Sequence, residues 1–319
     1  RLMDPSYFTP RAARISNWLE LANEFRKTLG TPAPDAGGAS EEDVLEERVF
    51  DADPAPASIA AGSEEEAALL ARVDALLRPA LRAMPDAFRL MCLRGRKYRV
   101  ERAAAAVRQL TELLRVLDPA TAPDPARAEA QLLEQMRAGK IEISGGADDD
   151  GRAILTVRLR ANDPTRSAPA DYARLLVYSV LWALRDNPEA QRQGVVFFVD
   201  ATDVSLRNSD PPTSKLTKWV AGQLPVRVAQ IVVYNAPFAF GSVMAPLALA
   251  AMPALRRRVK LVNSAEHAAL HAAVQPSALT AEFGGKLDFD REAWAIAALQ
   301  YGQSQSRAAV AACFGLTDL

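Results

Sequence analysis

The sequence predicts an α/β protein, with an N-terminal helical bundle packed on a mixed, mainly parallel sheet that helices cover. Two observations support this fold class. After residue 150 the chain contains short runs rich in Val, Ile and Phe, which are typical of strands, at residues 154–159, 194–201, 230–236 and 257–263. These runs are apolar on both faces, as in a sheet covered on both sides. Helical patterns alternate with them, as in a parallel sheet, at residues 170–187, 213–224, 240–254 and 265–274.

The part of the chain before the sheet is predicted to have three segments. Residues 1–29 are expected to form an amphipathic helix, because apolar side chains such as Trp18 and Phe25 recur at helical spacing. Residues 30–66 are rich in Pro, Gly, Ala and acidic residues, which is typical of a flexible linker. Residues 67–145 return to helical periodicity and are predicted to form a helical module that ends in a short β-like segment.

The sheet-forming domain is predicted over residues 146–286, and residues 287–319 form a C-terminal extension. This extension contains Trp294 and Tyr301. We expect it either to cap the domain or to lead into a further domain. The chain begins with Arg1 rather than Met, which is compatible with a fragment of a longer protein.

The bulk composition excludes several function classes. The 319 residues are 49% hydrophobic and 24% charged, with a formal net charge of -1, so no overall basic field attracts nucleic acid. Cys92 and Cys313 lie far apart in the sequence and form neither a disulfide framework nor a multi-cysteine metal site. We therefore expect a reducing, cytoplasmic setting. No uninterrupted apolar run reaches the roughly 18 residues that a membrane span needs.

Common catalytic motifs are absent from the sequence, which contains no P-loop, no GxGxxG and no GxSxG. Asp200 and Asp203 end a predicted buried strand and are the best acid–base candidates by position. A hydrolase built on Asp200 and a histidine therefore stays open as a weaker hypothesis. Cys92 lies between Met91 and Leu93 and is expected to be a core thiol rather than a nucleophile.

Two groups of residues resemble metal ligands but lack the required pattern. His267 and His271 are spaced i,i+4, but no glutamate lies between them and no third ligand is evident. Positions on a surface helix are therefore favoured. Asp148, Asp149 and Asp150 are consecutive and lack the alternate spacing of a calcium loop, which favours a solvated turn. We expect no metal site.

A charge-free segment from Phe238 to Leu255 is followed directly by three arginines, Arg256 to Arg258. A helix that is apolar on all sides is buried or lies in a membrane. The arginines, and the earlier run from Arg94 to Lys97, permit two interpretations. They form solvated helix ends, where cations favour the dipole, or anion sites, because the arginine fork suits phosphate. The residues alone leave both open.

Several stretches together resemble the CRAL-TRIO lipid-transfer family, over about residues 67–290. Residues 86–104, DAFRLMCLRGRKYRVERAA, are similar to the signature of the family's N-terminal helical module. The others follow in the family's order and at about its spacing: GRAILTVRL, GVVFFVDATDVS, IVVYNAPFAF, RRRVKLV and EFGGKLDFD.

This resemblance implies that the sheet forms the floor of a deep apolar cavity and that a mobile apolar helix, at residues 240–254 here, is its lid. It implies a protein that is not an enzyme. Such a protein binds a single lipid or lipophilic molecule in the closed cavity and exchanges it with membranes, with no covalent chemistry. No cofactor other than the bound lipid is expected.

The same resemblance implies the partners and the setting. The expected partners are a phospholipid, a phosphoinositide or another lipophilic ligand, together with a transient membrane surface. No nucleic acid is expected, and the protein would be a cytoplasmic monomer, peripheral at membranes. The alternative is a lipid-dependent targeting or regulatory module of a larger signalling protein, such as a phosphatase or a GTPase regulator.

The residues expected to contact the lipid are apolar and come from the strands, from the helix at 213–224 and from the lid. They are Phe198, Val204, Leu206, Val220, Leu224, Val232, Tyr234, Phe238, Phe240, Val243, Met244 and Leu247. Strand parity leaves one alternative, in which Ile231 and Val233 replace Val232 and Tyr234.

Three basic residues match positions that phosphoinositide-binding members use for the headgroup: Arg96, Lys97 and Arg258. The family's acidic residue after the proline that precedes the strand at residues 230–236 is Val226 here, and its Lys-Pro-Phe-Leu on the lid is residues 245–248, Ala-Pro-Leu-Ala. These departures leave phosphatidylinositol, another phospholipid, and a sterol, retinoid or tocopherol-like ligand open.

Overall fold

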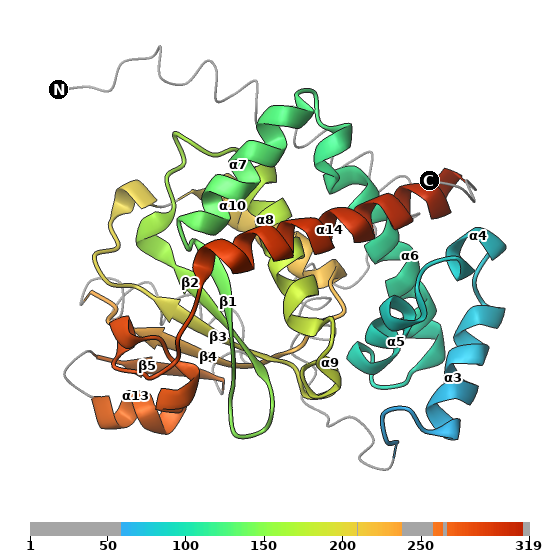
Figure 1. Ribbon diagram of the computed structural model, residues 1–319, viewed down its shortest axis with the longest axis horizontal. Helices are drawn as coiled ribbons and strands as arrows, with labels where there is room; N and C mark the ends of the chain where they lie inside the picture. Colours follow the sequence, from blue (N-terminus) through green and yellow to red (C-terminus); the bar gives the residue numbers. More distant parts are fainter. Residues whose placement is uncertain (1–58, 209, 238–257, 264–266, 315–319) are drawn as a thin grey trace, which may run out of the picture.

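The computed structural model describes residues 59–208, 210–237, 258–263 and 267–314 (Figure 1). The predicted N-terminal helix, most of the predicted linker and the segment expected to form the lid lie outside these residues. Within them, helices surround a mixed and mainly parallel sheet, which confirms the predicted α/β class.

The N-terminal helical module contains α3 (Glu64–Ala75), α4 (Pro79–Arg82), α5 (Asp86–Gly95), α6 (Val100–Leu117) and α7 (Pro125–Arg137), with the short turn η2 (Pro119–Thr121) between α6 and α7. The first of these begins three residues earlier than the predicted module. Ser63 precedes it and its hydroxyl accepts the backbone N–H of Glu66 at 3.2 Å, a cap that stabilises a helix start. The acidic run that resembled a linker is thus the first turn of α3.

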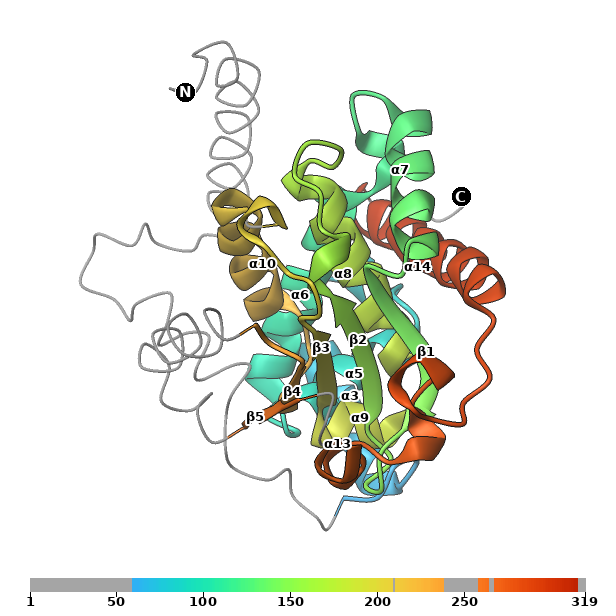
Figure 2. The ribbon, with the colours of Figure 1, turned by 90° about the vertical axis from the view of Figure 1, so that its left-hand side faces the viewer.

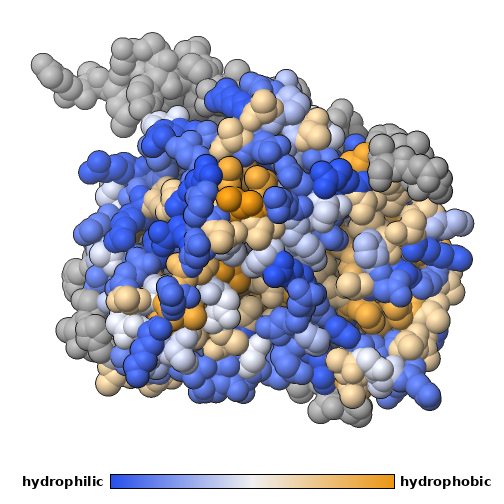
Figure 3. All heavy atoms as spheres, viewed as in Figure 1, coloured by the Kyte–Doolittle hydropathy of each residue, from blue (hydrophilic) through white to orange (hydrophobic). Residues whose placement is uncertain are grey.

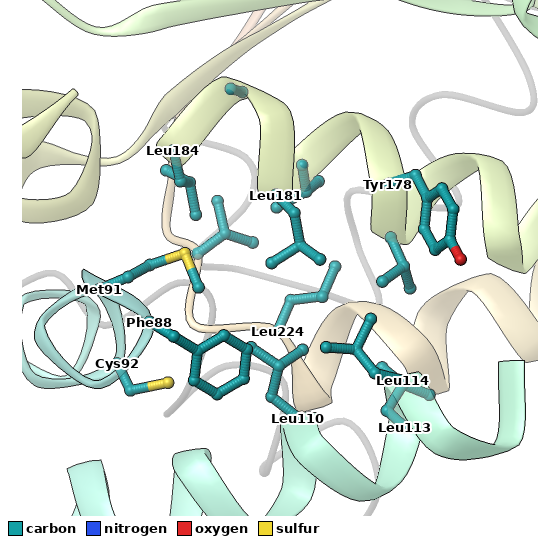
Figure 4. Packing of buried hydrophobic residues seen from close by; sticks show 14 of the residues in the cluster. Phe88, Met91, Cys92, Leu110, Leu113, Leu114, Tyr178, Leu181, Leu184 and Leu224 are labelled. Atoms are coloured by element: carbon teal, nitrogen blue, oxygen red, sulfur yellow. The ribbon is translucent and has the colours of Figure 1, made fainter. Parts of the chain in front are cut away.

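The apolar spacing of the module is confirmed by its longest helix. Apolar side chains of α6 that recur at helical spacing are all buried: Val100, Ala103, Val107, Leu110 and Leu114. They face α5 and α8 in the main core. Figure 4 shows Leu181 and Leu184 of α8 pointing toward Leu110, Leu224 and Met91.

The described part of the sheet has five strands in the order β1 (Ile141–Ala147), β2 (Ala153–Arg158), β3 (Val195–Asp200), β4 (Val228–Tyr234) and β5 (Val259–Val262). β1 pairs with β2 in the antiparallel sense, and the later pairs are all parallel. The β-like segment predicted at the end of the helical module is therefore the antiparallel edge of the same sheet.

Different helices cover the two faces of the sheet (Figure 2). α8 (Pro169–Leu184) packs against β1 and β2, and α10 (Pro211–Gln223) packs against α8. α9 (Pro188–Gln193) leads into β3. The opposite face is covered by α13 (His267–Ala273) and by two short turns, η6 (Pro276–Ala278) and η7 (Ala281–Phe283). Two further turns, η3 (Leu159–Ala161) and η4 (Leu206–Asn208), follow β2 and β3.

The C-terminal extension contains the long helix α14 (Arg291–Phe314), which packs against α6, α7 and α8 (Figure 1). Its contact with α8 depends on Gly302, because a Cβ at this position would overlap the ring of Tyr178. The Tyr178 hydroxyl in turn forms a 2.9 Å hydrogen bond with Ser306 of α14. The extension therefore joins the helical module to the sheet. On the face shown in Figure 3, apolar side chains form separated patches among polar ones.

Cys92 lies in the main core and is fully buried. Burial raises the pKa of its thiol to about 12. Because the thiolate is the reactive form, this agrees with the predicted structural role.

Candidate functional site

One face of the sheet has a run of apolar side chains that are only half-buried. β3 contributes Phe197 and Val199, and their partners in register on β4 are Ile231 and Val233. Beyond them on β5 lie Val259, half-buried, and Leu261, which is 51% exposed. Register partners share a face of the sheet. We call this set of six residues the apolar strip.

The apolar strip lies on the same side of the sheet as α8 and α10. Phe197 and Val199 pack against the main core, as do Leu216 and Trp219 of α10, which are half-buried. Val220 and Leu224, which were expected to line the cavity, are fully buried in that core. The strip thus begins where the packed core ends, and it carries no charged side chain.

The intervening strand residues lie on the opposite face, in a closed core. Phe198, Val232 and Tyr234 are buried there beneath α13 and η7. The ring of Phe198 meets that of Phe283 edge to face at 4.7 Å, and the ring of Tyr234 at 5.8 Å. These three residues, which we expected to contact the lipid, are packed against protein. The alternative parity, with Ile231 and Val233, is the one that lies on the apolar strip.

The remaining expected cavity residues are placed only in part. Val204 is half-buried in the turn after β3. The side chain of Leu206 is not among the described ones. Five further residues lie outside the described part of the chain: Phe238 and, from the expected lid, Phe240, Val243, Met244 and Leu247. Sequence reasoning did not select Phe197, Val199, Val259 or Leu261. All four lie in the strand-like runs that the sequence analysis identified, but on the face of the sheet that it did not assign to the lipid.

The structure brings two of the three expected headgroup residues, Arg96 and Arg258, to one short segment, residues 224–228, which leads into β4. Arg96 donates from Nη2 to the carbonyl oxygen of Leu224 at 3.0 Å, and Arg258 donates from Nη1 to the carbonyl oxygen of Val228. Lys97 follows Arg96, and both are buried. A Cβ on Gly95 would overlap the carbonyl of Pro225, so this close approach requires glycine.

The interpretation of residues 94–97 as a solvated helix end is therefore wrong, because the arginines are buried. Arg94 forms an ion pair with Glu66 of α3, with Nε and Nη2 donating to its carboxylate at 2.7 and 2.6 Å. Burial alone would raise the pKa of Glu66. Hydrogen bonds from Arg94 and Gly62 outweigh burial and hold that pKa below its ordinary value, so the carboxylate is ionised at neutral pH.

The acid–base candidates are held by local contacts. Asp200 is buried, accepts the backbone N–H of Thr202 at 3.0 Å and lies 3.8 Å from a guanidinium nitrogen of Arg160. Asp203 follows in a left-handed turn with φ of 56°. These contacts give Asp200 a structural role at the end of β3, as the cap of a turn.

The two groups that resembled metal ligands have different surroundings. Asp148 accepts hydrogen bonds from the backbone N–H groups of Asp150 and Arg152 and forms an ion pair with the Arg152 side chain, which is the expected turn. His271 lies half-buried on α13. No cluster of three His, Cys, Asp or Glu side chains suited to a metal occurs among the described residues. Within the same residues, no helix has the length and apolar character to span a bilayer.

Residues 137–285 match the model of the CRAL/TRIO domain. This part of the chain is therefore a CRAL/TRIO domain, which confirms the resemblance seen in the sequence motifs. Domains of this family bind and transfer lipids.

Individual relatives are distant. Over 167 residues, or 52% of the chain, it is 24% identical to mouse tyrosine-protein phosphatase non-receptor type 9, and this match spans 28% of the phosphatase. Over 219 residues, or 66% of the chain, it is 26% identical to rat clavesin-2, spanning 65% of that protein. Among solved structures it resembles Sfh5 at 12% identity and a TM-score of 0.43, covering 88% of this chain and 96% of Sfh5.

Proposed function

We propose that this protein binds one lipid molecule against the apolar strip and exchanges it with membranes, without covalent chemistry. The observation that carries the proposal is the contrast between the two faces of the same strands. One face is closed by α13 and η7, whereas the other presents half-buried apolar side chains up to Leu261 at 51% exposure. An apolar surface of this kind in a lipid-binding domain is suited to hydrocarbon.

The dimensions of the strip favour a single ligand. Three strands about 4.8 Å apart and two residues along each strand give a floor of about 10 Å by 7 Å. Burial of hydrocarbon contributes about 0.8 kcal/mol for each methylene removed from water. A lipid that leaves a bilayer already has its chains out of water, so the site has to match the bilayer closely, and it needs cover on its open side.

We further propose that the apolar segment 240–254 supplies this cover, although it lies outside the described residues. The strands that precede and follow it in the sequence, β4 and β5, are parallel neighbours in the sheet. Parallel neighbours are almost always joined by a right-handed connection. Because β2–β3, β3–β4 and β4–β5 step in the same direction across the sheet, such a connection would pass on the side of α8 and α10, which is the side of the apolar strip.

For the headgroup we propose an anionic phosphate ester held by Arg96, Lys97 and Arg258. Support comes from the convergence of Arg96 and Arg258 on residues 224–228, at the end of the strip where β4 and β5 begin. Val226 within that segment is buried and apolar. Guanidinium and ammonium groups form charge-assisted hydrogen bonds with phosphate oxygens, so we propose an anionic phospholipid rather than a neutral ligand.

Vesicle-to-vesicle transfer of a fluorescent phospholipid by the full chain tests the proposal. Leu261→Asp places a charge on the apolar strip, and Leu76→Asp is a matched control, because Leu76 is 49% exposed at the end of α3. Both variants should fold, since both side chains are half in solvent. We expect Leu261→Asp to abolish most of the transfer and Leu76→Asp to retain it. Equal transfer by the two variants would mean that the strip does not bind lipid.

A second candidate function is a lipid-dependent targeting module of a larger signalling protein. The observation that favours it is the match to a tyrosine phosphatase, in which the shared region is 28% of the relative's length. The transfer assay separates the two, because a targeting module takes up lipid or binds vesicles without delivering lipid to acceptor vesicles. In both cases we propose a monomer that works in the cytoplasm at membrane surfaces.

A further inference from the structure

The turn between α5 and α6, which carries Arg96 and Lys97, has an unusual backbone. Lys97 and Tyr98 have φ values of 54° and 61°. Consecutive residues with side chains rarely adopt this left-handed region, and for a bulky residue such as Tyr98 it is a clear outlier. Conformations of this kind persist only where the surrounding contacts hold them.

A buried polar network holds this turn. The Tyr98 hydroxyl donates to Oε1 of Glu66 at 3.0 Å, and Arg94 donates two hydrogen bonds to the same carboxylate. Nη1 of Arg94 donates to Oε1 of Gln191 on α9 at 2.8 Å, and the backbone N–H of Gly62 donates to Glu66 at 2.8 Å. Glu66, Arg94 and Tyr98 are 2%, 8% and 6% exposed. The network therefore joins α3, α5 and α9 beneath the turn.

The same turn fixes the position of Arg96 and Lys97, which we call the basic pair, relative to residues 224–228. The backbone N–H of Lys97 donates to the carbonyl of Arg94 at 2.9 Å, and that of Tyr98 donates to the carbonyl of Leu93 at 2.9 Å. These bonds fix the turn on α5, whose last residue, Gly95, packs against Pro225. A shift of Tyr98 would therefore move the turn that carries Arg96 and Lys97, and with it the contact between Arg96 and Leu224.

We propose that the Glu66–Arg94–Tyr98 network positions Arg96 and Lys97 for an anionic lipid headgroup, so that Glu66 and Tyr98 are positioning residues that determine the preference for anionic over neutral lipid. The inference rests on the proposed function. Glu66 and Tyr98 lie outside residues 137–285, which match the CRAL/TRIO domain. The specificity of the site therefore depends on the N-terminal helical module as well as on the sheet.

The test is Tyr98→Phe in the full chain, with Tyr178→Phe as its matched control. Each removes one buried tyrosine hydroxyl and one hydrogen bond, to Glu66 in the first case and to Ser306 of α14 in the second. Glu66→Gln is less suitable, because it leaves Arg94 buried without a counter-charge and endangers folding. The measurement is lipid transfer from vesicles of phosphatidylcholine alone and from vesicles of phosphatidylcholine with phosphatidylinositol, together with a thermal melt of each protein.

We expect Tyr98→Phe to lower the preference for phosphatidylinositol over phosphatidylcholine by about tenfold, the size expected for loss of a hydrogen bond to a charged group. Tyr178→Phe should leave this preference unchanged at a similar melting temperature. Equal preferences in the two variants would overturn the inference while leaving lipid transfer intact. A wild-type protein that transfers phosphatidylcholine but not phosphatidylinositol would also overturn the inference, because it would show that Arg96 and Lys97 do not bind an anionic headgroup. A wild-type protein that transfers neither lipid would overturn the proposed function as well.

Discussion

Two adjacent phenylalanines on β3 provide a sharp test of which face of the sheet meets the lipid. Phe198 is fully buried and packs against Phe283 and Tyr234, whereas Phe197 is half-buried on the apolar strip. Phe198→Ala removes a ring from a filled core and should cost about 3–5 kcal/mol of unfolding free energy, a drop of roughly 10 °C in melting temperature. Phe197→Ala loses about half as much buried area and should cost about 1–2 kcal/mol.

The effects on lipid uptake should have the opposite order. Phe197→Ala removes part of the proposed cavity floor, so we expect uptake of a fluorescent phospholipid from vesicles to weaken by about tenfold, which corresponds to about 1.4 kcal/mol. Phe198→Ala, measured well below its melting temperature, should take up lipid nearly as well as wild type. Normal uptake by Phe197→Ala together with impaired uptake by Phe198→Ala would refute the assignment and place the lipid on the α13 face.

Two further predictions concern stability. Gly302→Ala should lower the unfolding free energy by about 1–3 kcal/mol, because the added methyl group overlaps the ring of Tyr178. Alanine is the better helix former, so a higher melting temperature would show that α14 does not pack this closely on α8. Lys140 is buried, donates at 3.1 Å to Gln135 and to Ser167, and burial lowers its pKa from 10.5 to about 8 despite nearby aspartates. Between these two values the unfolded chain binds more protons, so the wild type should gain about 2 kcal/mol relative to Lys140→Gln as pH rises from 8 toward 10. Parallel stability curves for the two proteins would contradict this.

The strands could be predicted from the sequence because β-branched and aromatic runs are a local signal. The face that each residue occupies could not. Phe197 and Phe198 are the same residue type, and β3 is apolar in both directions, so the period of two leaves the choice open. Which face is closed depends on α13 and on Phe283 of η7, which come much later in the sequence than β3 and cover one face of the sheet. That covering is a tertiary property with no signature in the strand itself.

The polar network of Glu66, Arg94 and Tyr98 could not be predicted from the sequence for a similar reason. Glu66 stands in an acidic run, next to a stretch rich in Pro, Gly and Ala, and this composition is typical of a linker. Its partner Arg94 lies 28 residues further along the chain, where a helix end in solvent is the ordinary expectation. Only packing of α3 against α5 brings the two together and turns both from surface charges into a buried ion pair. By contrast, the family motif predicted Arg96, Lys97 and Arg258 as headgroup residues. This stays a prediction, and in the structure Arg96 and Arg258 both contact residues 224–228.

The number of lipid molecules that the chain holds can be measured by native mass spectrometry. The full chain is incubated with vesicles of phosphatidylcholine and phosphatidylinositol, re-isolated and weighed intact. We expect a mass increase of a single phospholipid per chain, with phosphatidylinositol enriched over its share in the vesicles. This adduct should be lost in Leu261→Asp but not in Leu76→Asp. A folded protein that emerges with no lipid, or with a variable number of lipids unaffected by Leu261→Asp, would contradict the proposed function.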